Sequence, residues 1–157
     1  MSRYVWMSVI CLTFGLASHV GKADSQQSAV EFMEEYLSTF DSGYAQDITD
    51  LYNDPFYMVA PNGDIQIFES EKGIRKAIKS WKFYMKKGGV ARSQYGELNV
   101  QALSEDTAIA SALVERINEE EELLTSTGAT YNLRREAGSW KIFVIQLHGA
   151  GSIIRFK

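Results

Sequence analysis

Histidine is the side chain best suited to acid–base chemistry near neutral pH, and this chain of 157 residues contains only two. His148 closes an apolar run near the C-terminus, two residues after Gln146. Side chains two apart in a strand share one face, so a regular strand would place both with Trp140, Ile142 and Val144. We therefore predict His148 as the candidate acid–base group, with a purely structural histidine as the alternative.

The sequence lacks the residues that other common catalytic mechanisms require. The single cysteine, Cys11, lies in the N-terminal apolar run, and the sequence has neither a Gly-x-Ser-x-Gly elbow nor a glycine-rich phosphate loop. Two histidines and one cysteine are too few for the usual zinc or histidine-cluster sites. The glutamates at 119–122 are typical of a solvated turn. The sequence therefore predicts no metal and no cofactor.

The composition is that of one globular domain. Hydrophobic residues make up 45% of the chain and charged residues 23%, which excludes a disordered chain or a coiled coil. The formal net charge of -4 argues against a nucleic-acid partner, because such proteins present excess Lys and Arg to phosphates.

The first 23 residues have the pattern of a secretory signal peptide. The apolar run from Tyr4 to Ala17 is short for a membrane span but typical of a signal-peptide core. Gly21 and Ala23 supply the small residues that a cleavage site requires. We therefore predict a signal peptide over residues 1–23 and an exported, periplasmic or extracellular domain over residues 24–157. An uncleaved N-terminal anchor is the alternative.

Two helices are predicted at the start of this domain. Ser28 and Glu31 have the spacing of a capping box, and apolar residues then recur at helical intervals as far as Phe40. Ser42-Gly43 supplies the stop. A shorter helix is expected next, ending at Asp54-Pro55.

A hairpin and a third helix follow. The apolar runs 56–60 and 65–68 flank Pro61-Asn62-Gly63, a strong hairpin signal. The third helix, over 71–87, has one apolar face, and basic residues occupy much of the rest. That basic surface is either a solvated outer face or an anion-binding face.

From Val90 onward the pattern is that of long strands, the last from Trp140 to His148 after a tight turn at Ala137-Gly138-Ser139. The expected order is α-α-β-β-α-β-β-β-β. We predict an α+β fold in which three helices from the N-terminal half pack on the concave face of a cone-shaped, curved antiparallel sheet.

This order resembles the nuclear-transport-factor-2-like superfamily, which includes SnoaL-like cyclases and ketosteroid isomerases. The segment Leu133-Arg134-Arg135-Glu136-Ala137-Gly138-Ser139-Trp140-Lys141-Ile142 is similar to the final hairpin of that superfamily. Tyr36, Gly43, Leu51, Asp54 and Pro61-x-Gly63 are spaced as in ketosteroid isomerases. The resemblance covers residues 25 to 157 and implies a single SnoaL-like cone domain.

The resemblance also implies which residues line a pocket. Ketosteroid isomerases carry an Asp base directly before a Pro-x-Gly turn, but Ala60 occupies that position, and alanine cannot abstract a proton. Their oxyanion hole pairs a tyrosine with a protonated acid. Tyr36 matches that tyrosine, and Tyr131 falls where the acid would be, so two phenols would donate instead, unless both only fill the core. The implied ligand-binding residues are Tyr36, Met58, Ala60, Trp81, Tyr131 and Gln146, and the implied catalytic residue is His148.

Two functions remain open at this point. The first is an exported cone that binds a small apolar ligand without proton-abstracting isomerase activity. The second is a SnoaL-like lyase, cyclase or isomerase that acts on an apolar carbonyl compound with His148 as its acid–base group. We also expect a homodimer through an apolar stripe of Phe143, Ile145 and Leu147, and no membrane contact after signal cleavage.

Overall fold

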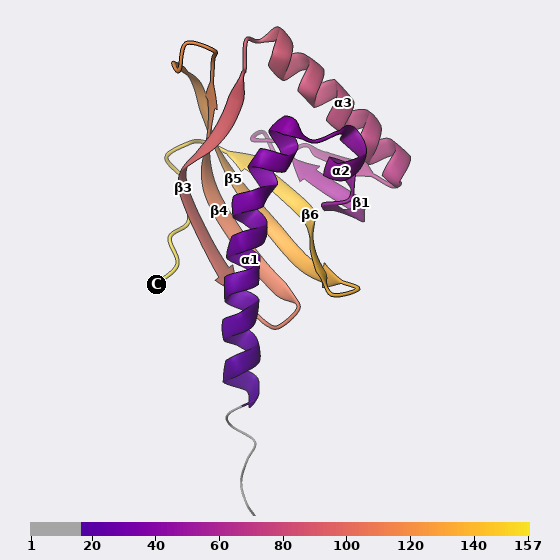
Figure 1. The fold of residues 1–157 in the computed structure, drawn as a ribbon, viewed down its shortest axis with the longest axis vertical. Helices are drawn as coiled ribbons and strands as arrows, with labels where there is room; N and C mark the ends of the chain where they lie inside the picture. Colours follow the sequence, from indigo (N-terminus) through magenta and orange to yellow (C-terminus); the bar gives the residue numbers. More distant parts are fainter. Residues whose placement is uncertain (1–16) are drawn as a thin grey trace, which may run out of the picture.

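The computed structural model describes residues 17–157, with side chains from residue 23 onward (Figure 1). The element order is the predicted one: α1 Ala17–Ser42, α2 Ala45–Thr49, β1 Tyr52–Val59, β2 Ile65–Phe68, α3 Glu71–Lys87, β3 Arg92–Ala102, β4 Thr107–Ile117, β5 Leu123–Glu136 and β6 Ser139–His148. The prediction of an α+β fold with its helices in the N-terminal half is therefore confirmed.

The strands form one open sheet in the order β2-β1-β6-β5-β4-β3. The β1–β2 hairpin lies at one edge, and α3 carries the chain across to β3 at the other edge. The chain then returns through antiparallel neighbours to β6, which pairs in parallel with β1. The sheet is thus antiparallel except at this one junction, where the two halves of the chain meet.

Helix α1 lies across the concave face of the sheet, as Figure 1 shows, and begins earlier than predicted. Ser28 is inside the helix and not at its N-cap, so the capping-box prediction is wrong. Its hydroxyl oxygen instead accepts hydrogen bonds from Arg135 Nη2 at 2.7 Å and Trp140 Nε1 at 3.0 Å. These bonds hold α1 against the β5–β6 hairpin. Residues 1–16, most of the predicted signal peptide, lie outside the described residues.

The second helix is shorter than predicted. It ends at Thr49, and Tyr52 to Pro55 already belong to β1. The reason is tertiary: Tyr52 pairs with Ile142 of β6, whose N–H donates to the Leu51 carbonyl at 2.9 Å. Sheet pairing therefore overrides the local helical spacing, and Tyr52 becomes a buried residue of the core.

The interior of the cone is filled by a row of aromatic rings, which we call the aromatic row. Neighbouring ring centroids along it lie 5.6 Å (Tyr131–Tyr36), 6.2 Å (Tyr36–Tyr52), 4.6 Å (Tyr52–Phe56), 5.5 Å (Phe56–Phe68) and 5.8 Å (Phe68–Trp81) apart. Most of these contacts are edge-to-face, the arrangement that aromatic quadrupoles favour. The row runs from β5 through α1 and the β1–β2 hairpin to α3, so it joins the middle of the sheet to its β2 edge and to α3.

None of the helices within residues 17–157 is long and apolar enough to cross a membrane. The same part of the chain contains no group of three His, Cys, Asp or Glu side chains that could hold a metal ion.

Candidate functional site

Four tyrosines form a phenol cluster inside the cone: Tyr36 from α1, Tyr52 from β1, Tyr95 from β3 and Tyr131 from β5. The hydroxyl groups of Tyr36 and Tyr52 share a hydrogen bond of 2.6 Å. The Tyr95 hydroxyl oxygen is buried and has no hydrogen-bond partner. The sheet and α1 thus bring Tyr36 and Tyr131 together, as predicted, and add two phenols that the prediction did not include.

Burial keeps these phenols protonated. It raises the pKa of Tyr36, Tyr95 and Tyr131 well above the ordinary tyrosine value, and it raises the pKa of Tyr52 as well. The guanidinium of Arg116 acts in the opposite direction on all four. At neutral pH the cluster therefore offers neutral O–H donors beside a fixed positive charge.

A polar network lies at the C-terminal end of α1, next to this cluster. The Asp41 carboxylate accepts hydrogen bonds from the Ser93 N–H at 2.5 Å and from the Ser93 hydroxyl at 2.8 Å. Arg116 Nη1 donates to the same hydroxyl. The Arg116 guanidinium lies 6.0 Å from the centroid of the Phe40 ring, and that ring is 6.1 Å from Tyr36. Phe40 and Arg116 therefore form the boundary between the phenol cluster and the end of the cone.

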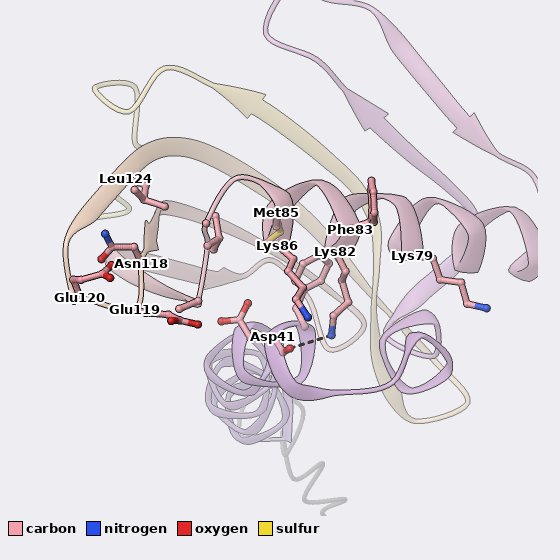
Figure 2. A pocket seen from close by; sticks show the side chains of 14 residues that line it. Asp41, Lys79, Lys82, Phe83, Met85, Lys86, Asn118, Glu119, Glu120 and Leu124 are labelled. Atoms are coloured by element: carbon pink, nitrogen blue, oxygen red, sulfur yellow. Dashed lines mark hydrogen bonds between the residues drawn. The ribbon is translucent and has the colours of Figure 1, made fainter.

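Beyond this boundary is a hollow of about 910 Å³, which we call the mouth hollow (Figure 2). It lies between the end of α1, the second half of α3 and the β4–β5 turn. Its size is that of a small-molecule site. Its apolar lining comes from Phe40, Phe83, Met85, Val90, Ala91 and Leu124, and its charged lining from Asp41, Lys79, Lys82, Lys86, Glu119 and Glu120.

One of these charges has a structural role. Lys82 Nζ donates to the carbonyl oxygens of Asp41 at 3.0 Å and Gly43 at 2.9 Å, and Figure 2 shows the first of these bonds. The first carbonyl belongs to the last turn of α1 and the second directly follows it; a cation is favourable there because these backbone acceptors lack helical partners. Lys82 thus fixes α3 to α1 and sets the width of the hollow.

The predicted placement of Gln146 and His148 in the cone is wrong. Leu133 pairs with Ile142, but Asn132 pairs with Val144, so Phe143 is an extra residue in β6. One extra residue reverses the side-chain alternation. Beyond it, Ile145 lies opposite Tyr131 on the concave face, and Gln146 opposite Thr130 on the convex face.

His148 lies on the convex face with Gln146 and is held there. Its Nε2 lies 3.0 Å from the Thr130 hydroxyl, and its Nδ1 lies 3.1 Å from the Gly149 carbonyl. The ring packs directly on Gly128, where even a methyl group would collide with it. His148 therefore has no access to the phenol cluster, and its surroundings are those of a structural histidine.

The other predicted ligand-binding residues lie on the concave side but away from the hollow. Met58 packs against the core, and Trp81 contacts Phe56 and Phe68. Ala60 follows β1 and accepts the Gly63 N–H at 2.9 Å, so the predicted turn is present. Residue 60 itself supplies no carboxylate, because it is an alanine.

Prediction from the sequence missed Tyr52, Tyr95, Arg116 and the mouth hollow. One signal was available for Arg116. It continues the inward alternation of Ala108, Ala110, Ala112 and Val114, and an arginine at an inward position of an apolar strand is unusual. Tyr95 was hidden by the register shift at Gly96, which breaks the alternation of β3.

The family model for NTF2-like proteins (DUF6841) matches residues 25–150. The chain belongs to this NTF2-like family. The match begins at Ser25, which is buried and whose hydroxyl donates to the Glu105 carbonyl at 3.1 Å. The matched segment therefore coincides with the packed domain. Among curated proteins, none matches the sequence.

Solved structures share this fold at low sequence identity. An NTF2-like protein with a cystatin-like fold from Novosphingobium aromaticivorans is 17% identical, with a TM-score of 0.67 over 92% of this chain and 94% of that one. An NTF2-like protein of unknown function from Pseudomonas putida is 16% identical, with a TM-score of 0.64 over 80% and 87%. A protein from Catenulispora acidiphila in complex with S-DNPA is 14% identical, with a TM-score of 0.60 over 80% and 93%. These likenesses establish the NTF2-like cone fold.

Proposed function

We propose that this NTF2-like domain binds a small apolar molecule in the mouth hollow. The observation that carries the proposal is the contrast in packing at the end of the cone. The aromatic row fills the interior, but the hollow of about 910 Å³ leaves Phe83 62% exposed and Leu124 40% exposed. Large apolar side chains around a concave surface are typical of ligand sites. The solved Catenulispora relative in complex with S-DNPA is consistent with ligand binding on this fold.

The domain is proposed as a binding module without proton-abstracting isomerase activity. Ala60 supplies no base, and His148 lies on the other face of the sheet. The enzyme alternative depended on His148 as an acid–base group bordering the pocket, and the geometry removes that group from the pocket.

A neutral dye tests the proposal. N-phenylnaphthylamine should bind saturably with an increase in fluorescence. Phe83→Ser should weaken its binding about fivefold, because about 1 kcal/mol of apolar contact is lost. Tyr84→Ser is the matched control: Tyr84 is the next residue and is 64% exposed, but it does not line the hollow.

A second pair of variants repeats the comparison at the start of β5, on the opposite wall of the hollow from α3. Leu124→Ser should weaken dye binding, whereas Leu123→Ser should not, since only Leu124 lines the hollow. Equal effects within both pairs, or no saturable binding to the wild-type protein, would refute the proposal.

We also propose that the domain is exported after cleavage of residues 1–23. The match that begins at residue 25 and the packing of Ser25 support a domain that starts next to the predicted cleavage site. Intact-mass measurement of protein from its native host should show a chain that begins at Asp24. A chain that keeps Met1 would contradict export by this route.

The proposed homodimer requires a different surface from the stripe first predicted. Ile145 is buried on the concave face and Leu147 packs against the core, so the Phe143, Ile145 and Leu147 stripe does not exist. On the convex face, Ile65 and Ile67 of β2 are 62% and 55% exposed. We propose dimer contact there; Ile67→Lys should then shift a sedimenting dimer to monomer, and a monomeric wild-type protein would refute it.

A further inference from the structure

Arg116 is a cation on the inner face of the sheet. It lies opposite Ser93 and two residues beyond Val114, which lies opposite Tyr95. Arg116 and Tyr95 are therefore diagonal neighbours on the concave side. Arg116 is half-buried, although most inward residues of β4 are alanine or valine. A charge at such a position calls for a partner.

The described residues give Arg116 no carboxylate partner. Their ion pairs involve four other arginines, at positions 75, 92, 134 and 155. Asp41 is reached only through Ser93, whose N–H and hydroxyl both donate to that carboxylate. Beyond its bond to Ser93, the remaining guanidinium donors are left for another acceptor, and a guanidinium presents five.

Tyr95 supplies a second unused donor beside it. Its hydroxyl oxygen is buried without a hydrogen-bond partner, a state that costs free energy unless something binds there. Tyr36 and Tyr52 differ in this respect, since their hydroxyl groups bond to each other. An arginine without a carboxylate partner and a phenol without an acceptor match the oxygens of a carboxylate.

The mouth hollow is next to these donors but is not lined by them, so a head group would reach Arg116 and Tyr95 only past the Phe40 ring. Phe40 lines the hollow, and its ring contacts both the Arg116 guanidinium and Tyr36. Three lysines, Lys79, Lys82 and Lys86, offset the three acidic residues that line the hollow; Asp41 is bonded to Ser93, while Glu119 and Glu120 are exposed on the outer turn. An apolar body in the hollow would thus point its head group toward Phe40 and Arg116.

We infer that the ligand is an apolar monocarboxylate, whose carboxylate is bound by Arg116 and the Tyr95 hydroxyl while its chain occupies the mouth hollow. This inference rests on the proposed function and names the chemical class of the ligand. Arg116 supplies charge and paired donors, and Tyr95 supplies one neutral donor.

Decanoate and decanol test this inference, because they share a chain and differ in the head group. Calorimetric titration near neutral pH should show decanoate binding the wild-type protein about tenfold more tightly than decanol, as a charge-assisted hydrogen-bonded pair requires. Arg116→Gln should reduce that ratio to about one. Tyr95→Phe should lower it a few-fold, and Arg116→Lys should keep part of it.

Arg155→Gln is the matched control. It removes the same charge from an arginine that pairs with Glu97 and does not line the hollow, so the decanoate-to-decanol ratio should not change. If Arg116→Gln fails to fold, the wild-type ratio and Tyr95→Phe still decide the matter. A wild-type ratio near one, or a ratio that survives both Arg116→Gln and Tyr95→Phe, overturns the inference.

The outcomes also separate this inference from the proposed function. If the dye and decanol bind but decanoate has no advantage, the apolar site stands and the carboxylate subsite fails. If decanoate alone binds, in a manner that depends on Arg116, the carboxylate subsite stands and the site for neutral apolar molecules fails. If none of the three binds, both are overturned.

Discussion

The interior of the cone and its mouth contain similar apolar side chains, which are buried in the interior and exposed at the mouth. In the interior, the aromatic row places each ring against the next, and Phe56 is completely buried. At the mouth, Phe83 and Leu124 border an open hollow and remain largely exposed. Apolar residues therefore stabilise the fold where they are buried against one another. At the mouth they keep exposed surface that a ligand can cover.

The same contrast applies to the polar groups. The Tyr36 and Tyr52 hydroxyls satisfy each other within the row, whereas the Tyr95 hydroxyl has no partner and Arg116 bonds to Ser93 but to no carboxylate of the described residues. Polar groups with a hydrogen-bond partner in the domain stabilise it on its own. Polar groups without one gain a hydrogen bond only when a ligand supplies the acceptor. Phe40 thus lies between the packed aromatic interior, which stabilises the domain, and the hollow that is proposed to bind the ligand.

The largest expected effect is alkaline destabilisation of the interior. Burial raises the folded-state pKa of the four clustered phenols, so above about pH 10 the unfolded chain loses protons that the folded chain keeps. Stability is therefore complete below that pH and falls as pH rises, with a limiting slope of about 5 kcal/mol per pH unit for four phenols.

Urea unfolding on both sides of about pH 10 measures this slope. Tyr131→Phe should reduce it by about a quarter, since one of the four phenols is removed. Tyr44→Phe is the control, because Tyr44 is 84% exposed and should leave the slope unchanged. A stability that stays constant through this range would mean that the cluster is open to solvent.

The next effect contrasts two phenylalanines. Phe56→Ala should lower the free energy of unfolding by about 3–5 kcal/mol, because it leaves a cavity in the aromatic row. Phe83→Ala should change it by about 0.5 kcal/mol or less, because that ring is mostly exposed. Comparable losses for the two variants in chemical denaturation would remove the distinction between interior and mouth.

A smaller effect contrasts two tyrosines. Tyr36→Phe breaks the 2.6 Å bond and leaves the Tyr52 hydroxyl unpaired, which should cost about 1–2 kcal/mol. Tyr95→Phe removes a hydroxyl that has no partner, so stability should hold or rise slightly. Thermal unfolding of both variants gives the comparison; a larger loss for Tyr95→Phe would show that its hydroxyl is satisfied after all.

The smallest effect concerns the convex face. His148→Gln should leave dye binding unchanged, because the sheet separates this residue from the hollow. Fluorescence titration of the variant and of the wild-type protein with N-phenylnaphthylamine compares the two affinities. A clear loss of affinity would restore His148 to the ligand site.

The order of elements could be predicted because its signals are local: the helical spacing that leads to Phe40, the turn at Pro61-Asn62-Gly63 and the glycine turn at 138. The resemblance to ketosteroid isomerases correctly brought Tyr36 and Tyr131 together. Those parts required only the spacing of residues along the chain.

The rest of the site depended on sheet irregularities that carry no local signal. The extra residue at Phe143 moves Gln146 and His148 to the convex face, and both faces of β6 are apolar enough to hide it. Tyr52 lies in the core because it pairs with Ile142 of β6 and so becomes part of β1. The hollow is formed by α1, α3 and the β4–β5 turn together, so no single segment encodes it.

The central claim is that the apolar body of the ligand occupies the mouth hollow and not the aromatic interior, and the methionine methyl groups report on it directly. Met85 lines the hollow, Met33 is completely buried in the core, and Met58 packs against the core on β1. Methyl NMR of methionine-labelled protein during titration with decanoate should shift the Met85 resonance first and most strongly, with Met33 unchanged and Met58 little changed. A shift dominated by Met58 or Met33, with Met85 unmoved, would place the ligand inside the cone and contradict the account.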